Sequence, residues 1–329
     1  DYPKHLLKVN GSQKSLLQNT YDRVKDISSA VYVITEEGHA HHIKDQLSDL
    51  DDESFIIEPA RRGTASCILS GLFQIAKTHG ENEPIVFLAA DHFIRDVKGF
   101  SHTYKQAARI SQKAGRIVLV GIEPDYPSTG FGYIQKGEVF DETHYVFAVH
   151  SFKEKPDFST AQKYVKSGNY LWNSGTFVGS VATFIDKMKR FAPELNSAYG
   201  RLASSTTEKS FRNEYLKLEN IAIDYALMEK TQDLLVMPAS FDWMDLGSFT
   251  DLHKAVESNE DGNHTHGLNI ELEGVTNSFV QNHEEKPVAV IGLDNIAVIN
   301  SPNGVLVTRK DLAQAVGDIA KRIHNKQKG

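Results

Sequence analysis

The chain has 329 residues, of which 40% are apolar and 24% charged, and its formal net charge is −7. This length exceeds what one hydrophobic core usually holds, so a packed globular protein with one large and one small domain is expected. The acidic balance argues against nucleic acid or an anionic membrane as a partner. The single cysteine, Cys67, excludes an intramolecular disulfide and favours the cytoplasm, where thiols stay reduced. The apolar runs fall far short of the roughly 18 residues that span a bilayer, so no membrane partner is expected.

The first part of the chain alternates short β-branched runs with helical stretches. Four runs lack polar alternation, which is typical of strands buried on both faces: Val31–Ile34, Phe55–Ile57, Ile85–Leu88 and Ile117–Val120. Apolar spacing predicts helices over 15–24, 64–78 and 99–114. The alternation indicates βαβ units and a parallel sheet. Ligands of such sheets bind beyond the carboxyl ends of the strands, which is where Glu58 and Asp91 stand.

The second part of the chain predicts a change of architecture. Strands are expected over 132–135 and 146–152, followed by helices over 159–166 and 182–191. A stretch rich in Asn, Asp, Gly and His at 258–266 reads as a linker, so we divide the chain into domains 1–260 and 261–329. Beyond it, short strands such as Val288–Ile291 and Ile296–Ile299 are bounded by Gly, Asn or Pro, which favours a small β-helix. The apolar spacing over 311–324 predicts a final amphipathic helix.

Two aspartates are the candidate metal ligands. Asp91 follows a buried run directly, and Asp245 stands near a glycine in the segment Phe241–Gly247. Magnesium is commonly held by one or two carboxylates together with substrate phosphates, so two aspartates from separate segments would suffice. The alternatives are a helix cap or loop hydrogen bond for Asp91, and for Asp245 a turn residue that caps a helix at 248–256.

Lysines beside prolines and one polar segment are the other candidates. Lys4 and Lys155 each adjoin a proline, and an ammonium group on a restricted backbone suits phosphate; the alternative is a solvated surface group. The segment Leu171–Thr176 offers an amide, hydroxyls and a glycine to a hydroxyl-rich ligand, or is a turn that enters a strand at 176–178. Glu154 could accept hydrogen bonds from sugar hydroxyls or form a surface ion pair.

The order of these motifs resembles that of the bacterial mannose-1-phosphate guanylyltransferases, from Tyr2 to about Arg322. The matching segments, in chain order, are Pro3-Lys4, Ser15–Gln18, Glu58-Pro59, Gly63–Ala65, Ala90–His92, Gly130–Ile134, Lys153–Pro156, Leu171–Gly175, Ile223–Tyr225, Met228–Lys230 and Trp243–Gly247. The resemblance implies an α/β fold: a Rossmann-like nucleotidyltransferase domain with a mostly parallel mixed sheet, then a small left-handed β-helix and a terminal helix. It also implies a homodimer that joins GTP and mannose 1-phosphate and releases pyrophosphate.

Position within the matching motifs implies a role for each candidate. Asp91 and Asp245 would bind Mg²⁺, while Lys4 and Lys155 would contact phosphates; these four are the implied catalytic residues. The implied nucleotide site comprises Lys4, Glu58, Gly63, Thr64, Ala65 and Asp91. The implied sugar-phosphate site comprises Gly132, Glu154, Lys155, Asn173 and Asp224. The chemistry agrees with this inventory, because a phosphomonoester is already anionic above its second pKa of ~6 and needs positioning and charge neutralisation rather than a covalent nucleophile.

The sequence departs from the family pattern at two places. The family begins with a strand and a glycine-rich loop that carries a Gly-x-Arg signature, and this sequence begins downstream of it, at Asp1. We expect that segment to precede Asp1; the alternative is a catalytically inactive, regulatory homologue that binds nucleotide sugars. The family also usually carries Asn at the position of Gly63 and Pro at that of Ser66. Glycine at the first of these positions is common in related enzymes that use UTP or dTTP, which leaves those nucleotides as an alternative.

Overall fold

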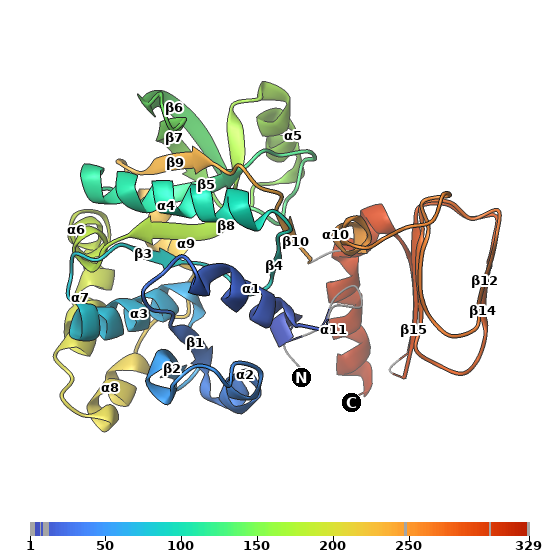
Figure 1. Ribbon diagram of the computed structural model, residues 1–329, viewed down its shortest axis with the longest axis horizontal. Helices are drawn as coiled ribbons and strands as arrows, with labels where there is room; N and C mark the ends of the chain where they lie inside the picture. The colour runs from blue at the N-terminus through green and yellow to red at the C-terminus, as the bar shows by residue number, and fades with distance from the viewer. Residues whose placement is uncertain (1–3, 7, 9–12, 247–248, 303, 328–329) are drawn as a thin grey trace. The chain divides into compact units, whose positions relative to one another are not determined.

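The computed structural model describes residues 4–6, 8, 13–246, 249–302 and 304–327. The chain divides into two compact units (Figure 1). Unit 1 consists of residues 1–7, 15–90 and 94–242, and unit 2 consists of residues 8–14, 91–93 and 243–329.

Unit 1 is built on a six-stranded sheet. Its strand order is β3 (Ile85–Phe87), β8 (Tyr170–Gly179), β5 (Val118–Ile122), β9 (Leu235–Pro238), β7 (Val146–Lys153) and β6 (Tyr133–Asp141). Neighbours are antiparallel except for β5 and β9, and β8 also pairs with β6. The predicted runs 85–88 and 117–120 are strands, but β8 lies between them and is antiparallel to both, so they are not adjacent parallel strands. The reason is that periodicity detects burial, as at the fully buried Val118, Leu119 and Val120, but not strand direction.

The two earliest predicted strands form a separate sheet in unit 1. β1 (Val33–Glu36) and β2 (Phe55–Glu58) pair in parallel, and α3 (Gly63–His79) packs against both of them (Figure 1). α4 (Val97–Ala114) packs against β5 and β8. The other predicted helices are α1 (Leu16–Lys25), α5 (Phe158–Ser167) and α6 (Val181–Phe191). Helical elements that the periodicity did not predict are η1 (Lys4–Leu6), η2 (Glu37–His39), α2 (Ala40–Gln46), η3 (Asp52–Ser54), α7 (Pro193–Ala203), α8 (Glu208–Tyr215), α9 (Ile223–Ala226) and η4 (Met228–Lys230).

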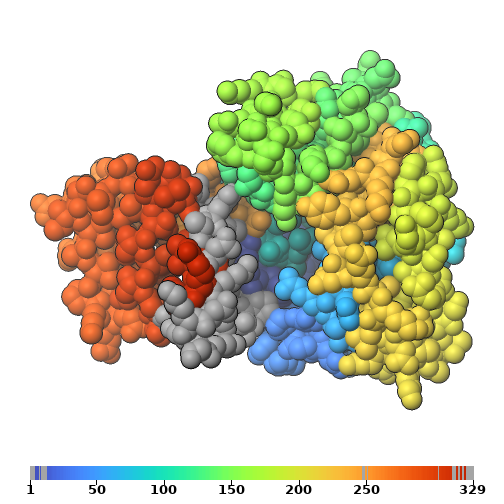
Figure 2. Space-filling model, turned by 180° about the vertical axis from the view of Figure 1, so that it is seen from behind, coloured from blue at the N-terminus to red at the C-terminus, as the bar shows by residue number. Residues whose placement is uncertain are grey.

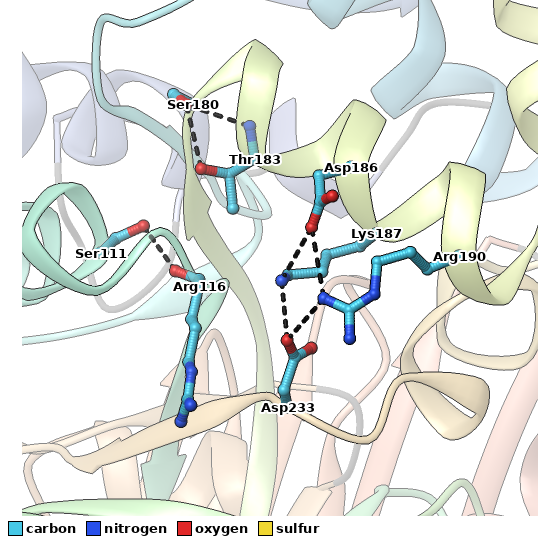
Figure 3. Close-up of polar contacts among 8 residues, drawn as sticks. All are labelled: Ser111, Arg116, Ser180, Thr183, Asp186, Lys187, Arg190 and Asp233. Carbon is cyan, nitrogen blue, oxygen red and sulfur yellow. Dashed lines mark hydrogen bonds and ion pairs between the residues drawn. The ribbon is translucent and has the colours of Figure 1, made fainter.

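A buried lysine ties α6 to the segment that leads into β9. Lys187 is 2% exposed, and its ammonium group donates to Asp233 at 2.8 Å and to Asp186 at 3.0 Å (Figure 3). Arg190 adds a bond of 3.1 Å to the same oxygen of Asp233. A charge removed from water needs such partners. The network therefore fixes the start of β9 against α6.

Unit 2 contains a β-helix. One sheet stacks β11 (His264–Gly267), β13 (Phe279–Asn282) and β15 (Ile296–Ser301) in parallel and ends with the antiparallel β16 (Gly304–Arg309). A second sheet pairs β12 (Ile270–Glu273) in parallel with β14 (Val288–Ile291). Apolar side chains pack together as its core: Val275, Val280, Val290, Ile296 and Val298. The predicted β-helix-like domain is therefore confirmed.

The remaining elements of unit 2 are short. β4 (His92–Phe93) pairs with β10 (Met244–Asp245), and α10 (Phe249–Ala255) follows along the chain. The helix predicted over 311–324 is divided into η5 (Lys310–Ala315) and α11 (Val316–Gln327), because hydrogen bonds of Lys310 hold the first turns on the β-helix. Gly247 and Ser248, part of a matching motif and of a predicted helix, lie outside the described residues. Within the described part of the chain, no helix is long and apolar enough to cross a bilayer.

Candidate active site

Asn173 organises one group of predicted site residues in unit 1. It lies in β8 at a β-bulge. Asn173 pairs with Gly121 of β5 and Phe177 pairs with Leu119, so β8 advances four residues where β5 advances two. This bulge holds the Asn173 amide in a fixed orientation: its oxygen accepts from the Gly175 N–H at 3.1 Å, and its nitrogen donates to Asp224 at 2.8 Å. The segment 171–176 is therefore part of a strand rather than a turn that precedes one.

Glu154 is a buried carboxylate beside Asn173. The Asn173 N–H donates to the Gly132 carbonyl at 2.8 Å, and a Cβ on Gly132 would collide with Oε2 of Glu154. Glu154 is 8% exposed, and its Oε2 has no hydrogen-bond partner among the described residues. Burial, followed by the charge of Asp224, raises the pKa of Glu154 to about 7. Burial also raises the pKa of Asp224. The pocket thus holds two carboxyl groups in a site that disfavours their charge.

The backbone at Lys155 separates two neighbouring side chains. Lys155 has a φ of +45°, a left-handed conformation that costs a residue with a Cβ about 1–2 kcal/mol. Glu154 is buried while Lys155 is exposed, and the Lys155 ammonium lies 3.6 Å from Oε1 of Glu154. The Glu154 N–H donates to Glu229 in η4 at 2.8 Å. Glu229 was not among the predicted site residues, although it belongs to the matching segment Met228–Lys230.

The first residues of α3, which belong to the predicted nucleotide site, are attached to the helix that carries Asp224. The Thr64 hydroxyl accepts from the Ile223 N–H at 2.9 Å, and the Ala65 N–H donates to the Ile221 carbonyl at 3.1 Å. The residue before α9 is an alanine without a capping oxygen, so Thr64 supplies from α3 the hydrogen bond that a cap would make. The start of α3 and Asn173 therefore both bond to α9 or to the residues just before it. In Figure 2 the surface of unit 1 is hollowed between the green segment around residue 150 and the gold segment that contains α9.

Gly63 is required by this attachment. Its φ is +76°, and a Cβ would lie 2.5 Å from the Ile221 carbonyl oxygen. We expect Gly63→Ala to destabilise the protein by about 2 kcal/mol or more, because strain adds to a backbone clash, and to displace α9. Gly80→Ala is the matched control: its φ is +87°, but no atom lies within 4 Å of the added Cβ. Equal losses of thermal stability in the two variants would contradict the assignment.

Glu58 lies at the end of β2, as the strand pattern predicted. It is buried and accepts a hydrogen bond of 2.8 Å from the hydroxyl of Tyr215 in α8. Burial raises the pKa of Glu58.

Lys4 lies in η1, which packs against α1 and α2, and the Leu6 carbonyl accepts from Gln46 at 3.1 Å. Tyr2 and Pro3, which precede Lys4 in its motif, lie outside the described residues.

The two predicted metal ligands both lie in unit 2. Asp245 stands opposite His92 in the β4–β10 ladder, and Asp91 is the residue next to His92. The Asp91 side chain is 35% exposed, and one of its oxygens lies 4.0 Å from Nε2 of His92. The His92 ring meets Trp243 edge-on at 4.9 Å between centroids. Asp245 therefore lies in a strand, and Asp91 lies in the turn that directly precedes the partner strand.

Within unit 1, Asp242 joins the segments that adjoin this ladder along the chain. Its Oδ1 accepts from the N–H groups of Arg95 at 2.9 Å and Asp96 at 2.8 Å. Asp96 in turn caps α4 by accepting from the Gly99 N–H at 2.9 Å. Sequence reasoning missed Asp242, because an aspartate that binds backbone N–H groups of a segment remote in sequence leaves no local pattern.

The chemistry of the predicted pair, two carboxylates, suits a magnesium ion that shares its coordination with phosphate. Asp91 and Asp245 supply the oxygen ligands that Mg²⁺ prefers. Among the described residues, no group of three or more His, Cys, Asp or Glu side chains is arranged to hold a metal. A pair of carboxylates leaves coordination positions for substrate oxygens and water, unlike a closed structural zinc site.

Comparison with known proteins identifies the family. Residues 1–262 match the model of the nucleotidyl transferase family, and residues 269–323 match that of the MannoseP isomerase/GMP-like β-helix domain. The chain therefore belongs to the nucleotidyl transferase family and is a nucleotidyltransferase. Its curated relatives include the mannose-1-phosphate guanylyltransferase of Escherichia coli, 33% identical over 98% of this chain and 71% of the relative. That of Sinorhizobium fredii is 35% identical over 97% of this chain and 63% of the relative.

Two solved structures extend this similarity to the fold. A Thermus thermophilus protein, described as a mannose-1-phosphate geranyltransferase, has a TM-score of 0.84 and 25% identity over 98% of this chain and 92% of its own. A Helicobacter pylori mannose-6-phosphate isomerase has a TM-score of 0.63 and 26% identity over 74% of this chain and 95% of its own. The family resemblance and the predicted α/β nucleotidyltransferase domain followed by a β-helix domain are thus confirmed. The prediction of a mostly parallel sheet is wrong, because only β5 and β9 pair in parallel in the six-stranded sheet.

Proposed function

We propose that the chain transfers the guanylyl group of GTP to mannose 1-phosphate, giving GDP-mannose and pyrophosphate. The observation that carries the proposal is that one short helix, α9, joins the start of α3 at Gly63–Ala65 to the hydrogen-bonded pair of Asp224 and Asn173. A nucleotide and a sugar phosphate must be held side by side for this reaction, and α9 connects the two candidate subsites. The names of the curated relatives support the choice of substrates.

In the proposed reaction the protein positions the two substrates and neutralises their phosphate charge, and it forms no covalent bond to either of them. Asn173 and the carboxylates of Glu154 and Asp224 would receive hydrogen bonds from sugar hydroxyls, and Lys4 and Lys155 would contact phosphates. The sugar-phosphate oxygen attacks the α-phosphorus of GTP, and the bond to the bridging oxygen of the β-phosphate breaks, so no proton transfer is required. Asp91 and Asp245 would hold Mg²⁺, which when bound neutralises phosphate charge and stabilises the departing pyrophosphate.

Nucleotide choice is the part of the proposal with a direct competitor. The alternative of UTP or dTTP came from glycine at position 63. The contact with the Ile221 carbonyl gives that glycine a packing reason, since a side chain there would strike backbone. Gly63 therefore does not favour UTP or dTTP over GTP.

The rate of pyrophosphate release with each nucleotide distinguishes the guanylyltransferase from the two alternatives, a UTP- or dTTP-dependent enzyme and an inactive regulatory homologue. Full-length protein is incubated with mannose 1-phosphate, Mg²⁺ and GTP, UTP or dTTP in turn. The proposal predicts that GTP is used fastest. A faster rate with UTP or dTTP would assign another nucleotidyltransferase activity, and no release with any nucleotide would favour the regulatory homologue.

Three further expectations belong to the same proposal. We place the domain division at 260/261, which is supported by family matches that end at residue 262 and resume at residue 269. A cytoplasmic homodimer is proposed from the family resemblance and from the single cysteine. Light scattering of the purified protein measures the assembly, and a monomeric mass would reject the dimer.

A further inference from the structure

Unit 2 contains a cavity that the proposed reaction does not use. Its volume is about 350 Å³. His253 and Lys254 of α10 line one part of it, together with Ser258. Asn277 and Lys310 of the β-helix and η5 line another part. All of the lining residues except Gly262 therefore carry hydrogen-bonding or cationic groups, on side chains that also present apolar atoms.

The β-helix residues that line the cavity lie at the same corner of successive turns of the β-helix. Gly262, Asn277 and Asn295 all line the cavity, and all have left-handed backbones, with φ of +72°, +46° and +53°. Asparagine tolerates this conformation better than most residues do. The Lys310 N–H donates to the Asn295 carbonyl at 2.9 Å and so continues the stack. The corner thereby brings two amide side chains and an ammonium group to the same cavity.

A buried lysine and histidine form the centre of the site. Lys310 is 6% exposed and His253 7% exposed, and the ammonium group of Lys310 donates to Nδ1 of His253 at 2.6 Å and to Oδ1 of Asn277 at 2.8 Å. Because Nδ1 accepts, the ring proton lies on Nε2, which donates to the Ser258 hydroxyl at 3.1 Å. Ser258 can then direct its own hydrogen towards a further acceptor.

The electrostatics of this centre favour the arrival of negative charge. Burial, followed by the charge of Lys310, lowers the pKa of His253 to about 4, so the ring is neutral near pH 7. His264 contributes in the same direction. Burial also lowers the pKa of Lys310, which means that its ammonium form is poorly solvated. An anion in the cavity would stabilise that form.

We propose that this cavity binds a small phosphate ester. Ammonium, hydroxyl and amide donors converge on it, and charge-assisted hydrogen bonds to phosphate oxygens are among the strongest that side chains make. A cavity of about 350 Å³ is larger than inorganic phosphate requires, so an ester of a small hydroxyl compound is the expected occupant. α10 also packs against β10, so the occupant would contact the helix that adjoins the strand of Asp245.

The test follows the imidazole resonance of His253 while inorganic phosphate is added at constant ionic strength and pH 7.5. The resonance is assigned by its loss in His253→Gln. Wild type should show a saturable shift, and Lys310→Met should raise the phosphate Kd by about tenfold or more. Lys254 is exposed, so Lys254→Met should fold normally and raise the Kd severalfold.

Lys286→Met is the matched control, since Lys286 is an exposed lysine of the same unit and does not line the cavity. It should retain the wild-type Kd. The proposal is overturned if wild type shows no saturable shift, or if the Kd in Lys254→Met and in folded Lys310→Met equals that of wild type. Equal weakening by Lys286→Met would also overturn it, because the effect would then be one of net charge.

Discussion

Replacing either Asp91 or Asp245 with asparagine is expected to lower kcat by about 10²–10³-fold, the loss that follows removal of one preorganised electrostatic contact. Asparagine keeps the shape of aspartate but offers a neutral oxygen, which binds a divalent cation weakly. Asp91 is 35% exposed and Asp245 lies in a two-residue strand, so the thermal midpoint should change little. The measurement is pyrophosphate release with GTP and mannose 1-phosphate over a range of Mg²⁺ concentrations.

A control separates this effect from the general loss of a negative charge. Asp261 is exposed and lies in the same unit, so Asp261→Asn should retain wild-type kcat. Raised Mg²⁺ should recover part of the activity of the two site variants by mass action. Wild-type turnover in either Asp91→Asn or Asp245→Asn would refute the metal assignment.

The second large effect concerns Glu154. Its pKa of about 7 means that kcat/KM for the sugar phosphate should rise with pH through about 7, as the carboxyl group ionises and becomes a stronger acceptor for hydroxyl groups. Glu154→Gln should lower kcat/KM by about 10–100-fold above pH 8, since hydrogen bonds to charged groups contribute about 1.5–3 kcal/mol. It should also abolish the rise in kcat/KM near pH 7. The substrate titrates near ~6 with both proteins, so the difference between the profiles isolates Glu154.

The same raised pKa has a consequence for stability. The folded protein holds the Glu154 proton more tightly than the unfolded chain does. The associated stability is fully present below pH 4.5 and is lost as the pH rises through about 7. Across that window the free energy of unfolding should fall by about 3 kcal/mol more in wild type than in Glu154→Gln, where Glu58 and Asp224, whose pKa values are also raised, still contribute. Glu138→Gln, an exposed control, should keep both the wild-type rise in kcat/KM near pH 7 and the wild-type stability profile. If the rise in kcat/KM near pH 7 persists in Glu154→Gln, a group other than Glu154 is responsible for it.

The sequence predicted the positions of helices and strands better than it predicted which strands pair with one another. Apolar spacing located α3 and α6 to within a residue or two, because a helix several turns long repeats its pattern. The same spacing could not show that β8 inserts between β3 and β5, since a run of buried residues looks alike in either direction. α9 has only four residues, which is too few for any periodicity to be detected.

The candidate site was predictable where one residue carries its own signal. Asp91 and Glu58 could be proposed because they follow buried runs directly, and Asn173 because it lies in a distinctive polar segment. Glu229 and Asp242 could not be found in this way. Each acts by accepting N–H groups from a distant segment, and only the folded backbone brings those donors to them.

The attachment of α9 limits how the enzyme can be redesigned. Thr64 accepts a hydrogen bond from Ile223 in the first turn of the helix, and Asp224 is the next residue. Under the proposed assignment, a substitution that reshapes the nucleotide side therefore also moves the sugar side. Preferences for the two substrates are thus coupled traits rather than independent ones. Directed evolution towards a new base should pass through variants whose hexose selectivity has drifted, and recovering it would require compensating changes around Asn173.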